Sequence, residues 1–312
     1  MNKIVRMWNQ NRKLIIAAII AIALLIIVIQ VLNQIAKENK TNNNQKENEI
    51  EGLPTKSIIG GQAVSTEITQ NNVEEIETFI KKCNSGDIEG AYNMLTDDCK
   101  DVVFASKLEN FKKGYCDIIF SSKRTGDIEN FVSGNGRYTY RVKFYVDMLS
   151  TGSVKDTGSY QDYITIDENA NGGKLSINSL LYRKVINKEN ELNGVKVIVK
   201  SQEVYKDYEN YEVKFENATN KRILIDTRTK TKTVYALGSN GVAYSSNISE
   251  VSSALCEIPA NFYRTYTLRF DKTYSSGVQT NGIAFTDIVP DYETYRQNTK
   301  DYNSRLKISV SI

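Results

Sequence analysis

The sequence predicts an α+β cone, with three helices on a curved antiparallel sheet, followed by an all-β sandwich and preceded by one transmembrane helix. Three patterns predict this fold class. A long apolar run lies near the N-terminus, a helix-like apolar period follows it, and an alternation with a period of two fills the second half. Helices that precede strands along the chain, rather than alternating with them, are typical of α+β proteins.

The apolar run covers residues 14–32 and contains no charge and one polar side chain, Gln30. As a helix it would extend about 28 Å, close to the hydrocarbon thickness of a bilayer. Residues 1–13 carry four basic residues and no acidic one, which predicts a cytoplasmic N-terminus. A cleaved signal peptide is the alternative, although no small-x-small cleavage pattern follows directly. We expect a single-pass protein of the cell membrane that contacts the lipid bilayer through residues 14–32, with its C-terminal domains outside.

Composition excludes several classes of function. Residues 33–72 are rich in Asn, Gln, Lys and Glu, which predicts a flexible linker. Residues 73–312 hold 32 basic and 32 acidic residues, so no basic surplus indicates a nucleic-acid partner. The chain has no histidine, which excludes Ser–His–Asp and Cys–His catalysis and any histidine-bearing metal site. No Cys-x-x-Cys pair, Gly-rich phosphate loop or acidic calcium loop occurs, so we expect no catalytic residues, no metal site and no cofactor.

Residues 73–190 are expected to form the α+β domain. Apolar side chains recur with a helical period over residues 73–83 and 87–95, and a third helix is expected over about 106–120. The period then changes to two, which predicts strands at residues 124–132, 137–149, 159–167 and 174–183.

Residues 191–312 consist of short alternating segments separated by turn residues, without a clear helix. This spacing is typical of a β-sandwich. The last segment, residues 306–312, alternates apolar and polar side chains and is expected to pair within a sheet.

Two stretches carry family resemblances. FIKKCNSGDIEGAYNMLTDDCK, Phe79–Lys100, with the following helix and strands, resembles the nuclear-transport-factor-like (SnoaL-like) cone. YEVKFENATNKRILIDTRT, Tyr211–Thr229, resembles the immunoglobulin-like modules appended to Gram-positive surface proteins. The combination is similar to uncharacterised single-pass envelope proteins of Gram-positive bacteria. We therefore expect a non-catalytic, extracytoplasmic binding or assembly module whose partner is an envelope protein or a cell-wall ligand.

Two alternatives remain. The layout resembles the scaffold subunits of conjugative type IV secretion, which place cone domains outside one N-terminal span, but a sandwich stands here where relatives often have a second cone. The other alternative is a small-molecule isomerase or hydrolase that uses the cone cavity. Asp147, Tyr160, Asp162 and Tyr163 lie on predicted strands and would be its candidate acids. A deep cavity holding a desolvated aspartate would favour the enzyme.

Tyr205, Tyr208 and Tyr211 cluster near one turn and form a candidate binding surface, because tyrosine rings anchor many interfaces. The alternative is that they are ordinary strand residues. Outside the cell cysteines can be oxidised, and the favoured disulfide is Cys83–Cys99, with Cys99–Cys116 as the second choice. Reduced thiols buried in the core remain the other possibility. Cys256 is expected to be a free, buried thiol on a strand.

Overall fold

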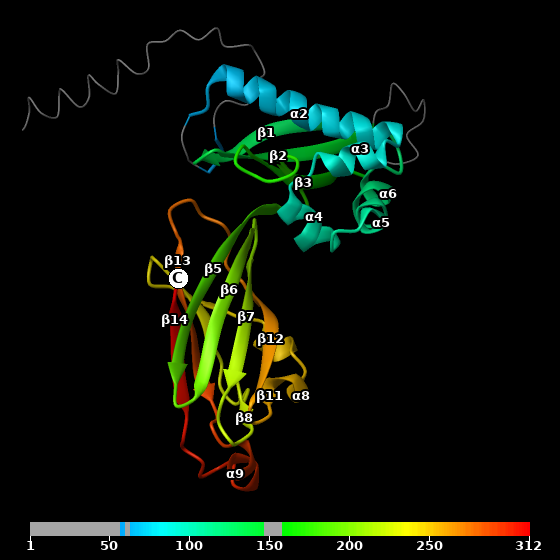
Figure 1. Ribbon diagram of the computed structural model, residues 1–312. Helices are drawn as coiled ribbons and strands as arrows, with labels where there is room; N and C mark the ends of the chain where they lie inside the picture. The colour runs from blue at the N-terminus through cyan, green and yellow to red at the C-terminus, as the bar shows by residue number, and fades with distance from the viewer. Residues whose placement is uncertain (1–56, 60–62, 147–157) are drawn as a thin grey trace, which may run out of the picture. The chain divides into compact units, whose positions relative to one another are not determined.

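A four-stranded antiparallel sheet with the order β1-β2-β3-β4 forms the first part of the molecule (Figure 1). The computed structural model describes residues 57–59, 63–146 and 158–312. Alternate residues of the second strand, Tyr140, Val142 and Phe144, are fully buried, as the period of two requires. The strands are β1 (Arg124–Gly134), β2 (Arg137–Val146), β3 (Tyr160–Asp167) and β4 (Leu175–Ser176).

Helices cover one face of this sheet, and only the first is long (Figure 1). Ser65 caps it by accepting a hydrogen bond from the backbone N–H of Ile68 at 3.2 Å, and Gly86 ends it in the left-handed conformation at φ 77°. The helices are α2 (Thr66–Ser85), α3 (Ile88–Asn93), α4 (Asp97–Phe104), α5 (Leu108–Phe111), a π-helical turn (Lys112–Cys116) and α6 (Asp117–Ile119).

Two further four-stranded sheets, with the orders β12-β7-β6-β5 and β10-β9-β13-β14, form the second part. Their inner faces share one apolar core, in which the rings of Phe215 and Phe285 meet edge to face at 4.8 Å. The strands are β5 (Leu180–Leu192), β6 (Val195–Tyr205), β7 (Glu209–Asn217), β9 (Val234–Gly238), β10 (Ala243–Ser245), β12 (Phe262–Phe270), β13 (Thr280–Ile288) and β14 (Leu306–Ser311). Shorter elements complete it: β8 (Ile223–Leu224), β11 (Glu257–Ile258), a 3-10 turn (Ile248–Glu250), α8 (Ser253–Cys256) and α9 (Tyr292–Gln297).

Strand β5 joins the two parts. It pairs with β6 from Leu180 to Leu192, so the boundary expected at residues 190/191 falls inside this strand. Near its start Arg183 forms an ion pair with Asp101 of α4 at 3.0 Å. A small apolar cluster that includes Phe131 and Tyr163 of the first sheet and Leu181 of β5 packs at the same place. The described residues accordingly belong to one unit, Leu53–Ile312.

The predicted fold class is wrong. Strands dominate the described residues, and beside the first sheet only α2 is a long helix, whereas the other helical segments are short. The helix expected over residues 106–120 is divided into α5, the π-helical turn and α6, and Ala105 and Ser106, with positive φ values of 51° and 56°, separate it from α4. Left-handed backbone at two successive non-glycine residues ends a helix, and composition alone does not indicate it.

The predicted linker is also partly wrong. Helix α2 begins at Thr66, and the backbone N–H groups of Ile58 and Ile59 donate to the carbonyl oxygens of Asn130 and Phe131 on β1 at 3.0 and 3.1 Å. Two polar residues of this stretch, Thr69 and Asn72, are buried rather than solvated. Asn72, for example, is 6% exposed and donates to the hydroxyl of Tyr140 at 3.1 Å.

The predicted single-pass arrangement is contradicted within the part of the chain that the structure describes. None of its helices combines the length and the apolar character that crossing a bilayer requires. Helix α2 has 20 residues but carries charged side chains throughout. The expected span at residues 14–32 and the tail at residues 1–13 lie outside the described residues.

Candidate functional site

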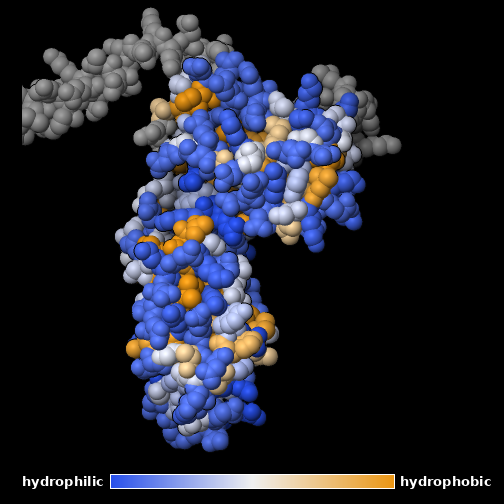
Figure 2. All heavy atoms as spheres, viewed as in Figure 1, coloured by the Kyte–Doolittle hydropathy of each residue, from blue (hydrophilic) through white to orange (hydrophobic). Residues whose placement is uncertain are grey.

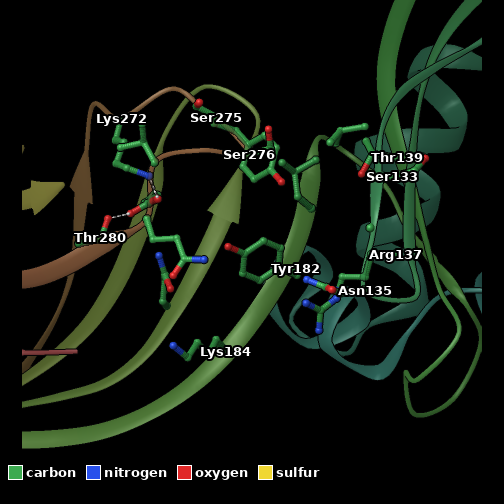
Figure 3. Close-up of a pocket in the computed structure, with 18 residues that line it drawn as sticks. Ser133, Asn135, Arg137, Thr139, Tyr182, Lys184, Lys272, Ser275, Ser276 and Thr280 are labelled. Atoms are coloured by element: carbon green, nitrogen blue, oxygen red, sulfur yellow. Dashed lines mark hydrogen bonds and ion pairs between the residues drawn. The ribbon is translucent and has the colours of Figure 1, made fainter. Parts of the chain in front are cut away.

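A cavity of about 460 Å³ lies where the end of the β1–β2 hairpin approaches strands β5–β7 and the β12–β13 connection. Its lining is rich in hydroxyl, amide and cationic side chains. Figure 3 shows Lys272 and Thr280 on one side of the cavity and Asn135 and Arg137 on the other. The floor is buried, whereas the rim is exposed and includes Lys184.

The hairpin owes its shape to local sequence. Asn135 and Gly136 form its two-residue turn with φ values of 55° and 74°, and Gly134 pairs with Arg137 on either side. Positive φ at both turn residues is the type I′ geometry that Asn-Gly favours. The turn thereby places Arg137 at the cavity, where its guanidinium lies 4.9 Å from the centre of the Tyr182 ring and its Nε donates to Asp167 at 2.7 Å.

A buried ion pair forms the floor of the cavity. Lys272 and Glu209 are each 2% exposed, and the lysine Nζ donates to Glu209 Oε1 at 2.6 Å. The other carboxylate oxygen, Oε2, accepts from the hydroxyls of Tyr211 and Thr280, both at 2.7 Å. Gln202 Nε2 donates to the Tyr211 hydroxyl at 2.8 Å. This network compensates both charges, as buried charges require.

Burial also changes the pKa values of two tyrosines at the cavity, Tyr182 and Tyr211. Burial, followed by the neighbouring Tyr274 and Glu209, raises the pKa of Tyr182 to about 12, although Arg137 opposes the shift. Burial, and then the charge of Glu209, raise the pKa of Tyr211 well above its usual range. Both phenols therefore stay protonated at neutral pH and act as neutral hydrogen-bonding groups.

Asp162, one of the candidate catalytic acids, has a different environment. It is 3% exposed and accepts from the Tyr115 hydroxyl and the backbone N–H of Asn178 at 2.8 Å each. The backbone N–H groups of Tyr163 and Ser179 donate to its other oxygen at 2.7 and 2.8 Å. Burial raises its pKa, and these donors lower it without cancelling the effect of burial. Asp162 therefore holds the turn before β5 in place.

The other candidate acids do not gather around Asp162. Tyr163 packs against Phe131 with ring centres 4.7 Å apart, and Tyr160 lies beside the guanidinium of Arg124 at 5.0 Å. Asp147 lies outside the described residues. The structure therefore shows no group of acids at a common cavity among the described members of this set.

The three tyrosines of the candidate binding surface do not lie together on an exposed face. Tyr205 and Tyr211 are buried, and Tyr211 belongs to the core between the two sheets of the second part. Tyr208 is half-buried, with its ring stacked on Tyr205 at 4.5 Å and the guanidinium of Arg269 at 4.3 Å from its centre. Tyrosine is common on strands whether its side chain faces the core or the solvent, and here Tyr205 and Tyr211 face the core.

The favoured disulfide, Cys83–Cys99, is not formed in the structure. All four cysteines are free and buried. Cys83 lies next to Cys116, with 4.0 Å between the two sulfur atoms, whereas Cys99 accepts a hydrogen bond from the backbone N–H of Ile177 at 3.4 Å. Cys256 is a free, buried thiol, as expected, but it is the last residue of helix α8 rather than a strand residue. Burial raises the pKa of Cys99 to about 12, which makes it an unreactive core residue.

Exposed apolar side chains are scattered. Phe262 and Tyr263 at the start of β12 are 50% and 56% exposed, with their rings stacked at 5.7 Å. Figure 2 shows small, separate hydrophobic patches on a mainly hydrophilic face. Isolated exposed apolar residues are ordinary on protein surfaces and by themselves indicate no partner.

Comparisons with known proteins add little. No family model and no curated protein matches the chain. The chain is similar to a crystal structure described as a conserved hypothetical protein from Bacillus anthracis, with 14% identity over 29% of this chain and 81% of that one. The TM-score of 0.23 is too low to carry an argument about fold or function. The cone and immunoglobulin-like resemblances thus remain predictions.

Sequence reasoning missed the cavity residues, although a signal for two of them was present. Glu209 stands in the inward register of β7, which continues with Tyr211 and Val213. Lys272 continues the inward register of β12 two residues after Phe270. A charged residue at an inward position is unusual, and two of opposite sign on paired strands indicate a buried ion pair.

Proposed function

We propose that this protein is a non-catalytic binding module whose ligand is a small polar molecule that enters the cavity above Lys272 and Glu209. The observation that supports this proposal most directly is the Lys272 ammonium group. It is 2% exposed and lines the cavity, yet it donates to one acceptor only among the described residues. An ammonium group has three donors, so two remain for a bound molecule or for water.

The carboxylates argue against a catalytic role. A general base needs a free lone pair within reach of a substrate proton. Each oxygen of Asp162 accepts at least two hydrogen bonds within the protein, which uses all its lone pairs. Glu209 accepts two at Oε2 and one at Oε1, and the lone pair left on Oε1 lies beside the Lys272 ammonium, which weakens it as a base. Both groups are therefore suited to positioning rather than to proton transfer.

Ligand-observed NMR tests the proposal. The full-length chain is mixed with a set of small hydroxylated, anionic, cationic and apolar compounds, and saturation transfer and product formation are recorded together. We expect polar compounds to bind and to be recovered unchanged. Conversion of a bound compound would indicate an enzyme, and binding that is confined to apolar compounds would contradict the proposed cavity.

Repeating the saturation-transfer measurement of each hit with a Tyr182→Trp variant tests whether the compound binds in the cavity. The larger ring would occupy part of the cavity and is expected to abolish the transfer signal. A matched Tyr263→Trp variant changes an exposed ring elsewhere and should leave the signal intact. The extracytoplasmic location and the assembly role predicted from the sequence stay predictions that this experiment does not address.

A further inference from the structure

The charges of the cavity lining do not cancel. Arg137, Lys184 and Lys272 contribute three positive charges and Glu209 one negative charge, which leaves a formal charge of +2 on the lining. Asp167 pairs with Arg137 from outside the lining and reduces this excess. Lys184 forms no ion pair or side-chain hydrogen bond with any residue that the structure describes.

Depth adds to the effect of charge. Lys184 and Arg137 lie toward the rim, where solvent screens them, whereas the Lys272 ammonium is buried on the floor. A charge that is removed from water interacts more strongly with a ligand than a charge on the surface. The Lys272 Nζ also lies 5.9 Å from the centre of the Tyr244 ring, but Glu209 is the only acceptor of its hydrogen bonds among the described residues, so its two other N–H groups are the strongest donors that the cavity offers to a ligand.

The remaining lining indicates the rest of the ligand. Hydroxyl groups of Ser275 and Ser276 stand at the exposed rim, and the half-buried Tyr182 ring lies between the cationic groups of the two sides (Figure 3). Hydroxyl groups both donate and accept, so they suit a ligand that carries hydroxyl groups itself. The volume of about 460 Å³ lies within the range of small-molecule sites.

From these observations we infer that the cavity binds a sugar-sized, hydroxylated anion whose carboxylate or phosphate group reaches Lys272 and whose charge is balanced by Arg137 and Lys184. This inference deepens the proposed function and rests on it. Oxygen anions are the acceptors that ammonium and guanidinium groups hold best. A neutral sugar would leave the excess positive charge uncompensated, and an organic cation would be repelled.

Isothermal titration calorimetry on the full-length chain tests the inference with three matched probes: glucuronate, glucose 6-phosphate and glucose. The two anions should bind at least about tenfold more tightly than glucose, because each charge-assisted hydrogen bond adds roughly that factor. Their affinity should fall as salt is raised, while that of glucose should not. Binding of one anion only would support the inference and identify the anionic group as carboxylate or phosphate.

Two variants place the anion. Lys184→Gln removes one rim charge without breaking a side-chain contact among the described residues, and should weaken anion binding roughly threefold to tenfold. Lys200→Gln removes the same charge from the outer face, where Lys200 pairs with Glu212 at 2.8 Å, and should change the affinity less than about twofold. Arg137→Gln should weaken anion binding to a similar extent as Lys184→Gln. The melting temperature of the Arg137→Gln variant is measured as well, because Asp167 loses its ion-pair partner.

Three results would overturn the inference. Equal affinity for glucose and glucuronate would contradict the charge argument and leave the proposed binding function intact. Equal losses from Lys184→Gln and Lys200→Gln would show a general charge effect rather than a site. No binding by either anion would overturn the inference, and the proposed function would fail with it only if the NMR screen also found no polar ligand.

Discussion

Two buried carboxylates, Asp162 and Glu209, show how differently one chemical problem is solved in the two parts of this molecule. Asp162 accepts hydrogen bonds only from neutral groups: three backbone N–H groups, the Tyr115 hydroxyl and, at 3.4 Å, the Ser179 hydroxyl. Glu209 instead meets a lysine that is as buried as itself. The neutral donors around Asp162 satisfy its carboxylate and fix the chain there. The Lys272 ammonium has three N–H donors, and Glu209 accepts from only one of them.

The comparison shows which buried charge points to function. Saturated acceptors such as Asp162 leave nothing for a ligand, and their value is positional. A buried cation at a cavity, such as Lys272, still has hydrogen-bond donors that a ligand can use. Lys272 therefore indicates the candidate binding site, whereas the acids predicted from the sequence do not.

Lys272→Met is expected to have the largest effect on stability. It leaves the Glu209 carboxylate buried without its cation, and we expect the free energy of unfolding to fall by about 3–5 kcal/mol. Urea unfolding measures the loss. The double variant Lys272→Met/Glu209→Gln should recover much of it, because no uncompensated charge then remains. A loss below about 1 kcal/mol for the single variant would mean that the ion pair is not a buried one.

Asp162→Asn should cost less, about 2–3 kcal/mol, because it removes no partner charge. The amide nitrogen would face either the pair of donors at Oδ2, from Tyr115 and Asn178, or the pair at Oδ1. Urea unfolding again provides the measurement. Ser179→Ala is the matched control, since its hydroxyl makes only a long contact of 3.4 Å with Asp162, and it should change stability by less than about 1 kcal/mol.

The pH dependence of stability should differ between the wild type and Asp162→Asn. Burial raises the pKa of Asp162 in the folded state above its ordinary value of 3.8, so the folded state holds this proton more tightly than the unfolded state. The corresponding stability is fully present below pH 3.8 and is lost as pH rises through the folded-state pKa.

The size of this effect is about 1.4 kcal/mol for each unit by which the pKa is raised. Urea unfolding at a series of acidic pH values, with the difference between wild type and Asp162→Asn taken at each pH, isolates it. An unchanged difference across the series would show that Asp162 titrates as it does in the unfolded chain.

The smallest effect is expected for the exposed counterpart of the buried ion pair. Lys200 and Glu212 lie 2.8 Å apart on the outer face, with side chains 38% and 32% exposed. Lys200→Ala should lower the free energy of unfolding by less than about 1 kcal/mol, and added salt should reduce this loss further. A loss as large as that of Lys272→Met would remove the distinction between the two pairs.

The sequence alone indicated several elements because their causes are local. The alternation through Tyr140, Val142 and Phe144 forms a strand, and the expected final segment 306–312 pairs with β13 through Leu306–Ser311. The Asn135-Gly136 hairpin turn has an equally local cause, although it was not among the expectations. Turn chemistry and a period of two act within a few residues, so they are visible in the sequence. The π-helical turn at Lys112–Cys116 was not visible, because no residue pattern in this stretch signals it.

What this sequence determined by itself is therefore the strand periodicity, the turns and the absence of histidine chemistry. Tertiary structure decided which buried groups meet: Cys83 with Cys116 rather than Cys99, Tyr211 with Glu209, and Glu209 with Lys272 across 63 residues of chain. Periodicity states which face of a strand is buried but not what lies opposite that face. The partner depends on how sheets and connections pack over long sequence distances, and the cavity exists only after that packing is complete.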